Sequence, residues 1–317
     1  ISRGMGSSHP NKMIDISVII PCFRSPNNLS KYIKSISDEL ISLKKNYEII
    51  LINDFDNDKD MTWETLQLIK KNYKNIRIEK LVSNCGQQIA TIAGISISKG
   101  KYILTVDDDG QHNPKYFKEM FRLIQNNDLI IAKHQKRKIN FKREFGTFIV
   151  NKISKKIFKN LPNNFGFSSY RLVRGSLARE ITKFNTQNPV LGFELLQICP
   201  KVRNITINHQ KRINGKSTYS LLKLIKYFHQ LVYTYSNFYQ HVTMYFAFIF
   251  ALLSFLFATN LIYSFMMGHE YKAGYLTTAI LLTTLFSINF IILNILVNYT
   301  SSIKKISENK SRFVFYK

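Results

Sequence analysis

Three consecutive carboxylates, Asp107-Asp108-Asp109, have the spacing in this chain that most directly suggests chemistry. They follow an apolar run that ends at Val106, and Gln111 comes two positions later. Side chains alternate along an extended chain, so Asp107 and Asp109 should point one way and Asp108 the other. Hard oxygen donors, together with water and phosphate oxygens, suit Mg²⁺ or Mn²⁺ rather than zinc. The pattern predicts a divalent metal held by Asp107, Asp109 and Gln111, although a solvated acidic turn also fits the triplet alone.

The segments around the triplet alternate between two kinds of apolar pattern. Apolar runs typical of buried strands cover residues 13–21, 47–54 and 101–106, and residues 75–82 are a further predicted strand. Helical spacing covers residues 29–44, 62–71 and 87–98. This alternation predicts a mainly parallel α/β sheet covered by helices on both faces. Ligands of such sheets collect beyond the carboxyl ends of the strands. Asp54 and the acidic triplet both follow predicted strands, which makes them site candidates.

Two long runs near the end of the chain carry no charged side chain, residues 242–268 and 274–299. Each exceeds the roughly 20 residues that cross about 30 Å of hydrocarbon. The short connection between them predicts a helical hairpin with both ends on one side of a membrane. Basic residues flank this hairpin: Lys223, Lys226, Lys304, Lys305, Lys310 and Arg312. The positive-inside rule therefore predicts that the flanks and the amino-terminal domain face the cytoplasm.

The net charge indicates which partners the protein binds, and the cysteine spacing indicates which structural features it lacks. The formal net charge of +25 calls for anionic partners, and the basic residues cluster beside the apolar runs. This distribution favours membrane lipids and phosphorylated substrates, with no nucleic acid as partner. Basic amphipathic patterns at about 145–159 and at 221–240 suit a membrane surface, although packing on a globular core fits the first equally well. The three cysteines are far apart, which argues against a disulfide framework or a zinc site.

Four segments occur in a characteristic order: "ISVIIPCFRSPNNL" from residue 16, "EIILINDFDND" from 48, "NCGQQIATIAGISISKGKYILTVDDDGQHNP" from 84 and "HQKRINGKSTYSLLKLIKY" from 209. Together they resemble the inverting family 2 glycosyltransferases, and more narrowly the polyprenyl-phosphate glycosyltransferases. The resemblance covers about residues 16–227, and the terminal hairpin matches bacterial members. It implies a GT-A fold and a sugar transfer from a nucleotide-sugar donor of the UDP or GDP type.

The resemblance also implies roles for single residues. Asp107 and Asp109 would hold Mg²⁺ or Mn²⁺ against the donor diphosphate, with Gln111 beside them. The residues implied in nucleotide binding are Pro21, Phe23, Asp54, Asn84, Gly86, Gln87, Asp107 and Asp108, with Asp54 recognising the base. A motif near the membrane would hold phosphate through Arg212, Gly215, Ser217 and Tyr219. Departures from the family pattern at residues 23–25, 53–56 and 134 leave the base and the sugar open.

The expected chemistry needs little beyond a metal and cationic side chains. A lipid monophosphate is largely dianionic at neutral pH and is already a nucleophile. Asp109 and Arg212 are therefore predicted to be catalytic through charge stabilisation, and a general-base role for Asp109 ranks below metal ligation. Basic residues such as Lys133 and Arg143 are candidates for binding phosphate. Glu194 fits either a contact with the acceptor or sugar, or a capping or surface role.

The sequence thus predicts an α/β protein of the GT-A class, with a Rossmann-like, mainly parallel sheet. The predicted boundaries are a vector-derived segment at 1–12, the GT-A domain at 13–220, a juxtamembrane amphipathic helix at 221–240, a two-helix hairpin at 241–299 and a basic cytoplasmic tail at 300–317. The predicted reaction transfers a sugar with inversion to polyprenyl (undecaprenyl) phosphate, at the cytoplasmic face of a bacterial plasma membrane, for cell-envelope polysaccharide synthesis.

Three alternatives stay open at this level. A relative acting on a lipid-linked glycan or another hydroxyl acceptor would need a general base beyond the metal pair. A non-catalytic, membrane-tethered protein that binds nucleotides or anionic lipid would carry the same composition. Nucleic-acid binding by the basic stretches is the weakest alternative, and it would require a steep salt dependence of oligonucleotide binding. A homo-oligomer is compatible with the pattern but is not fixed by it.

Overall fold

The computed structural model describes residues 13–25, 28–55, 61–134, 155, 158, 161–162, 165–184, 186, 189–208, 238–269, 274–307 and 312–316. The chain divides into two compact units. The first unit comprises residues 1–221 together with 311–317, and the second comprises residues 222–310.

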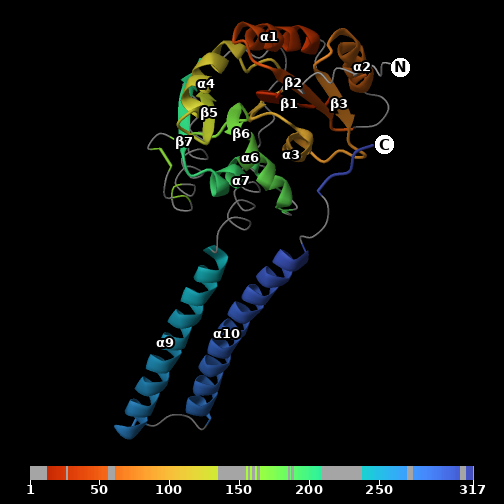
Figure 1. The fold of residues 1–317 in the computed structure, drawn as a ribbon. Helices are drawn as coiled ribbons and strands as arrows, with labels where there is room; N and C mark the ends of the chain where they lie inside the picture. The colour runs from red at the N-terminus through yellow and green to blue at the C-terminus, as the bar shows by residue number, and fades with distance from the viewer. Residues whose placement is uncertain are drawn as a thin grey trace, which may run out of the picture. The chain divides into compact units, whose positions relative to one another are not determined.

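A seven-stranded sheet forms the centre of the first unit, in the order β3-β2-β1-β4-β6-β5-β7 (Figure 1). The strands are β1 Ile16–Cys22, β2 Tyr47–Asn53, β3 Ile76–Lys80, β4 Tyr102–Thr105, β5 Leu129–His134, β6 Arg171–Arg174 and β7 Val202–Ile207. β1 pairs in parallel with both β2 and β4, and β5 pairs in parallel with β7. The chain winds outward from β1 to β3 and then returns to β4 on the other side of β1. The strand order therefore reverses between β1 and β4, which is where open α/β sheets bind their ligands.

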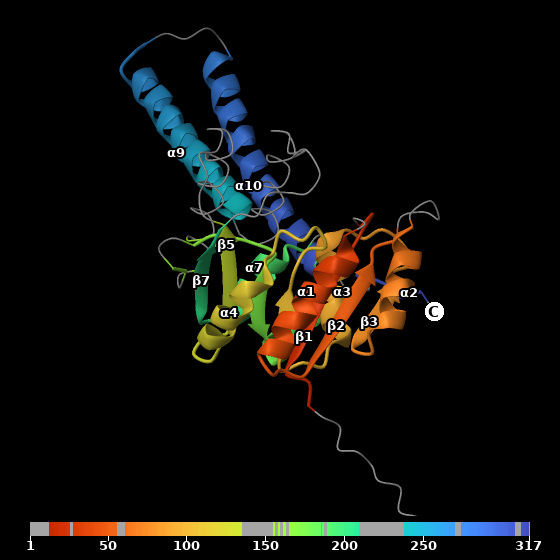
Figure 2. The ribbon, with the colours of Figure 1, turned by 90° about the horizontal axis from the view of Figure 1, so that it is seen from above.

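Helices cover both faces of the sheet, as Figures 1 and 2 show from two directions. One face carries α1 Leu29–Ser42, α2 Thr62–Asn72 and α4 Phe117–Ile124, and the other carries α3 Gln87–Ile97, α6 Gly175–Glu180 and α7 Leu191–Ile198. Short 3₁₀ turns lie at Pro114–Tyr116 and Ile181–Lys183. The helical spacing of Leu29, Ile33, Ile36 and Leu40 explains α1, because all four side chains are buried against the sheet. The strands alternate between the two cores, with Ile20 in one and Ile19 in the other.

The predicted α/β architecture with a mainly parallel sheet is confirmed. The helix and strand boundaries agree to within a few residues, and the first strand begins at Ile16 rather than at residue 13. The exception to parallel pairing is β6, which runs antiparallel to both β4 and β5. This strand is only four residues long. Its pattern was too short to be recognised in the sequence.

The second unit contains two long apolar helices, α9 Phe238–Met266 and α10 Tyr275–Ser307. They lie side by side and antiparallel, and the rings of Phe250 and Phe290 stack 4.3 Å apart. Residues 241–266 and 277–300 have mean hydropathies of 2.1 and 2.3, and both segments are long and apolar enough to cross a membrane. Helix α10 continues beyond the predicted end of the hairpin at Tyr299. The predicted amphipathic helices at 145–159 and 221–240 fall largely outside the described residues.

The last described residues return to the sheet of the first unit. Phe315 forms an antiparallel bridge with Leu81, directly after β3. Val82 N donates to Val314 O at 3.0 Å, and Tyr316 N donates to Lys80 O at 2.8 Å. Residues 312–316, called the C-terminal strap below, thereby cover an edge of the sheet that would otherwise leave backbone groups unpaired. Figures 1 and 2 both show this end of the chain beside β3.

Candidate functional site

The acidic triplet and the loop after β1 lie together because β1 and β4 are adjacent parallel strands, with Ile19 opposite Thr105. Asp108 Oδ2 accepts hydrogen bonds from Ser25 Oγ at 2.6 Å and from Phe23 N at 3.4 Å. Between these two residues Arg24 has a φ of 48°, a left-handed conformation that non-glycine residues rarely adopt. The tight turn at Arg24 thus brings its two neighbours onto Asp108.

The other two carboxylates have different partners. Asp107 accepts hydrogen bonds from Gln87 Nε2 at 2.5 Å and from Ser169 Oγ at 2.6 Å. Asp109 accepts from the backbone N and the side-chain Nε2 of Gln111, at 3.0 and 2.6 Å. The three carboxylates therefore contact different segments, and Asp108 and Asp109 lie in a turn instead of the extended chain on which the predicted alternation depended.

The charge of the triplet is reflected in neighbouring ionisable groups. Burial raises the pKa of Asp108 to about 6, its two hydrogen bonds oppose the shift, and the charges of Asp107 and Asp109 add to it. The pKa of Tyr32 is raised well above its ordinary range, first by burial and then by the three carboxylates. The hydrogen-bond donors to the triplet described above are all neutral. A cation would therefore be favoured at this end of β4.

The donor set fits a metal that is bound partly by a substrate. The described residues contain no group of three His, Cys, Asp or Glu side chains that could enclose a metal ion. Two carboxylates at a strand end provide an incomplete coordination sphere. Mg²⁺ is usually held in this way, by one or two carboxylates with water and substrate phosphates completing the shell.

His112 supports the acidic triplet through a buried ring that is hydrogen-bonded to the backbone of Asp107. Its side chain is buried, its Nδ1 accepts the backbone N–H of Asp107 at 3.1 Å, and its ring stacks on Tyr170 at 4.8 Å. Burial lowers the pKa of His112, so that the ring stays neutral and Nδ1 remains an acceptor. Tyr32 Oη donates to His112 O at 2.7 Å, and Tyr170 Oη donates to Asn113 O at 2.9 Å. No motif or spacing in the sequence points to this supporting role of His112.

The carboxylate of Asp54 organises a second loop. It is buried directly after β2 and accepts the backbone N–H groups of Cys85 at 2.7 Å and Gly86 at 2.8 Å. Gly86 has a φ of 87°, which favours glycine, and it precedes the first residue of α3, Gln87. Asp54 therefore fixes the start of α3, whose first side chain is bonded to Asp107.

A small pocket opens where α3, β4, β6 and α7 meet. It is lined by Gln87, Gln88, Thr91, Thr105, Val106, Asp107, Ser169, Arg171 and Leu191. Arg171 is buried, and its Nε donates to Ser168 O. Gln88 Oε1 accepts the backbone N–H of Leu191 at 3.1 Å, which ties α3 to α7. Sequence reasoning missed Ser169, Arg171 and Leu191 because they lie in segments without a recognisable motif.

The remaining site candidates lie in several places. Pro21 is buried in β1, Phe23 is 41% exposed and Asn84 is exposed in the loop before α3. Lys133 lies in β5. The predicted phosphate-binding residues outside the described ranges are Arg143, Arg212, Gly215, Ser217 and Tyr219.

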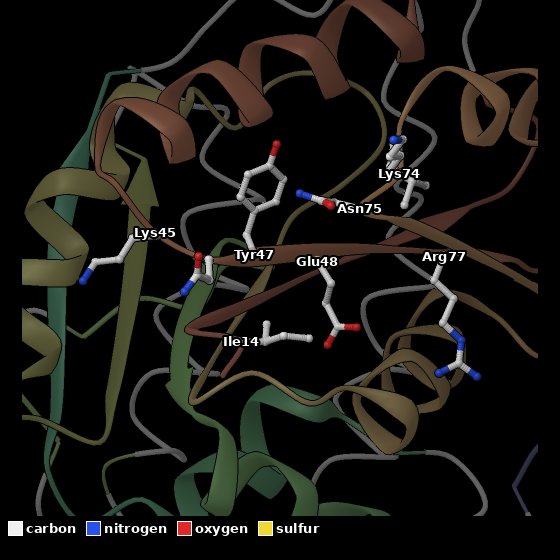
Figure 3. Close-up of a pocket in the computed structure, with 9 residues that line it drawn as sticks. Ile14, Lys45, Tyr47, Glu48, Lys74, Asn75 and Arg77 are labelled. Carbon is white, nitrogen blue, oxygen red and sulfur yellow. The ribbon is translucent and has the colours of Figure 1, made fainter. Parts of the chain in front are cut away.

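A larger cavity, of about 510 Å³, lies at the opposite ends of the strands (Figure 3). It is lined by Ile14, Lys45, Asn46, Tyr47, Glu48, Lys74, Asn75, Ile76 and Arg77, where β2 and β3 begin. Glu48 in its wall accepts hydrogen bonds from Ser17 Oγ at 2.5 Å and Lys99 N at 2.7 Å, so its carboxylate stabilises the sheet. Despite its size, this cavity lies at the wrong end of the strands for the acidic triplet.

The chain belongs to a family described as glycosyl transferase family 2, whose profile matches residues 17–182, more than half of its length. The predicted family is thereby confirmed. With the seven-stranded sheet and the two long apolar helices, the match also confirms the predicted GT-A fold class.

Two curated relatives are polyprenyl-phosphate sugar transferases by name. The chain is 22% identical over 226 residues to a dodecaprenyl-phosphate galacturonate synthase of Rhizobium johnstonii, covering 70% of this chain and 66% of the relative. It is 26% identical over 252 residues to an undecaprenyl-phosphate 4-deoxy-4-formamido-L-arabinose transferase of Edwardsiella ictaluri, covering 78% and 76%. These relatives confirm the predicted resemblance to polyprenyl-phosphate glycosyltransferases.

Among solved structures, the chain is similar to glucosyl-3-phosphoglycerate synthase from Mycobacterium tuberculosis in complex with Mn²⁺, UDP and glucosyl-3-phosphoglycerate. The TM-score is 0.49 at 15% identity, with 70% of this chain and 78% of that chain covered.

Proposed function

We propose that this protein transfers a sugar from a nucleoside-diphosphate sugar to polyprenyl phosphate, with inversion at the anomeric carbon. The observation that carries the proposal is the acidic triplet at the switch point between β1 and β4, in a chain that also has two apolar helices of membrane-spanning length. The names of the two curated relatives support the acceptor class. We take undecaprenyl phosphate as the polyprenyl species, which is the lipid in the name of one of these relatives.

The donor diphosphate would bind between the triplet and the amino end of α3. Asp107 and Asp109 would hold Mg²⁺ or Mn²⁺ there, with Gln111 as a further oxygen ligand. The metal would neutralise the charge that develops on the departing diphosphate. Gln87, already bonded to Asp107, and the first backbone N–H groups of α3 would face the same phosphates, because a helix amino end attracts anions.

The nucleoside would lie over the loops after β1 and β2. Pro21, Phe23 and Asp108 belong to the first of these, where the hydrogen bonds of Asp108 set the position of Phe23 and Ser25. Asp54 belongs to the second, where it fixes the Cys85-Gly86 turn beside Asn84. The Asp54 carboxylate is buried and holds the Cys85-Gly86 turn, so in this proposal Asp54 contributes to base recognition by shaping that loop, and the base is uracil or guanine.

The chemical step would use the acceptor phosphate as its own nucleophile. One phosphate oxygen would form a bond to the anomeric carbon while the bond from that carbon to the donor diphosphate breaks, so charge moves from acceptor to leaving group. Because the acceptor carries no proton on the attacking oxygen at neutral pH, no general base is required. Cationic side chains would then hold the two phosphorylated substrates together. The candidates are Lys133, Arg143 and Arg212, with Ser217 and Tyr219.

The membrane arrangement follows from the order of the segments. Residues on both sides of α9 and α10 belong to the first unit. A folded domain occupies one side of a membrane, so the intervening chain must cross an even number of times. Two spanning helices satisfy this condition, and the basic flanks would place the domain on the cytoplasmic side of a bacterial plasma membrane.

The test is a transfer assay with the full chain in liposomes. Nucleotide sugars of the UDP and GDP types are supplied one at a time, with Mn²⁺, Mg²⁺ or a chelator, and the lipid is analysed by mass spectrometry. Undecaprenyl phosphate should gain one glycosyl unit only when a metal is present. Parallel liposomes with undecaprenol or a lipid-linked glycan test a hydroxyl acceptor. Transfer to those lipids alone, or to none of the three, would refute the proposal.

A further inference from the structure

A buried ion pair joins the C-terminal strap to the body of the first unit. Arg312 Nη2 lies 2.9 Å from Glu194 Oε1, and Arg312 Nη1 lies 3.1 Å from Glu194 Oε2. The two side chains are 3% and 0% exposed. The sequence had counted Arg312 among the basic residues that flank the hairpin, and it had left Glu194 either a contact with the acceptor or sugar or a capping or surface role. The enclosed two-point contact rules out the surface role of Glu194.

The helix that carries Glu194 also forms a wall of the small pocket. Glu194 lies on α7, and Leu191 at the first position of α7 lines the pocket with Asp107 and Arg171. The hydrogen bond from Leu191 N to Gln88 Oε1 attaches this helix to α3. The pair with Arg312 is a second attachment, and it comes from the far end of the chain.

The strap also holds the loop that leads into α3. Val82 donates its backbone N–H to Val314 O directly after the bridge between Leu81 and Phe315. Four residues later, Gly86 is held by Asp54. The loop containing Asn84 is therefore fixed at its start by the strap and at its end by Asp54.

A third contact reaches the residue after Asp54. The ammonium group of Lys80 lies over three aromatic rings: 4.1 Å from the centroid of Phe55, 5.9 Å from Trp63 and 5.5 Å from Tyr316. Cations over aromatic faces attract the rings electrostatically. Tyr316 of the strap thus shares one cation with Phe55, which directly follows Asp54.

We propose that the C-terminal strap is a positioning segment of the donor site. It orients α7 through Glu194, the loop before α3 through Val82, and the loop after β2 through Lys80. This inference rests on the proposed function, because it assigns these three elements to donor binding. It also means that the donor site is completed by chain that follows the second apolar helix. In this proposal the strap residues act through these three elements and do not contact the substrate.

The prediction is specific to the donor. Loosening the strap should weaken the binding of UDP or GDP with Mn²⁺ and raise the KM for nucleotide sugar by about 10–100-fold, the usual effect of removing a group that orients the ligands of a metal site. The KM for undecaprenyl phosphate should stay unchanged. A strap that only stabilised the fold would lower the amount of active protein without separating the two KM values.

The test uses Glu194→Gln and Tyr316→Ala in the full chain. The first breaks the buried pair, and the second removes a ring that is 65% exposed, so that variant should fold even where the first fails. Tyr316→Phe keeps the ring and should restore affinity. The matched control is Glu180→Gln, which breaks the exposed pair of Glu180 with Lys183 at 2.7 Å.

Two measurements separate the possible results: nucleotide affinity by calorimetry, and hydrogen exchange of residues 81–86 and 191–198. Faster exchange together with weaker nucleotide binding would support the inference. Faster exchange with wild-type affinity would overturn it and leave the proposed function intact. A wild-type protein that binds neither nucleotide in the presence of Mn²⁺ would overturn the proposed function, and with it this inference.

Discussion

The first unit contains two concentrations of charge that differ in how the charge is balanced. At the end of β4, three carboxylates lie side by side in the chain, partly exposed, and their described hydrogen-bond donors are neutral. On α7, the carboxylate of Glu194 contacts the guanidinium of Arg312 at two points, and both side chains are almost fully buried. The triplet retains negative charge that a ligand can use. The Glu194–Arg312 pair has none left over.

This contrast separates a binding site from a structural contact by physical means. Burial raises the pKa of Asp108 to about 6, the neighbouring carboxylates add to this shift, and the triplet would be stabilised by a bound cation. An enclosed opposite pair gains nothing from a ligand and loses much when one partner is removed. Predictions for the two regions should therefore differ in kind, with stability affected at one and ligand binding at the other.

The largest expected change in stability is that of Glu194→Gln. Removing one charge leaves the Arg312 guanidinium buried without a counter-charge, which costs about 3–5 kcal/mol in the free energy of unfolding. Denaturant unfolding in detergent measures it. Glu180→Gln breaks an exposed pair and should cost about 0–1 kcal/mol. Similar losses for the two variants would show that the enclosed pair has no special role.

At the triplet, Asp107→Asn should act on catalysis instead. Sugar transfer should fall on the order of 10²–10³-fold, as when one group that stabilises developing charge is removed. The unfolding free energy should change little or rise, because a repelling charge is lost. Asp38→Asn, in an exposed position of α1, is the control. Unchanged transfer by the Asp107 variant would show that Asp107 neither holds the metal nor stabilises the leaving diphosphate.

Of these two regions, the sequence allowed only the acidic triplet and its neighbours to be predicted. The triplet, Asp54 and the Asn84–Gln87 segment follow strands that an apolar pattern identifies, and parallel strands bring their carboxyl ends to the same edge of a sheet. Their proximity could therefore be predicted without coordinates.

The Glu194–Arg312 pair could not be predicted, because it is a contact between residues far apart in the chain. Glu194 and Arg312 are separated by 118 positions and by both apolar helices. A basic residue after a membrane-spanning segment has an adequate local explanation, so nothing in the sequence pointed to a buried partner. The same holds for Ser169 and Arg171, which reach the site only because β6 inserts antiparallel between β4 and β5.

His112 provides a smaller test within the triplet. His112→Leu removes the acceptor of the Asp107 backbone N–H and should cost about 1–3 kcal/mol, the price of an unsatisfied buried donor. His112→Asn keeps an acceptor near the position of Nδ1 and should recover part of the loss. Comparable unfolding free energies for the two variants would argue that the hydrogen bond is unimportant.

The pH dependence of His112 has a definite sign. Burial lowers the pKa of His112 below its ordinary value of 6.5, so its contribution to stability is present above pH 6.5 and is lost as the pH falls through the folded-state pKa. The His112→Asn variant should lack this acid loss. Unfolding measured from pH 8 to pH 5 tests it, and identical profiles for variant and wild type would contradict it.

The substitution of Asp108 should have the smallest effect on the free energy of unfolding, and its pH dependence should be opposite to that of His112. The pKa of Asp108 is raised from 3.8 to about 6, so its relative stabilisation is complete below pH 3.8 and is lost as the pH rises through 6. In metal-free protein, Asp108→Asn should therefore be slightly more stable than wild type at pH 8, with the difference shrinking as the pH falls below 6. A variant less stable than wild type at pH 8 would mean that the ionised carboxylate is needed by Ser25 and Phe23.

The most direct test of the account is calorimetric titration of the full-length protein with UDP and with GDP, in Mn²⁺ and in chelator. The account predicts that one of the two nucleotides binds with Mn²⁺, that chelator abolishes this binding, and that Asp107→Asn and Asp109→Asn abolish it as well. Binding of equal strength in chelator, or in both variants, would contradict the assignment of the acidic triplet as the place where a metal meets the donor diphosphate.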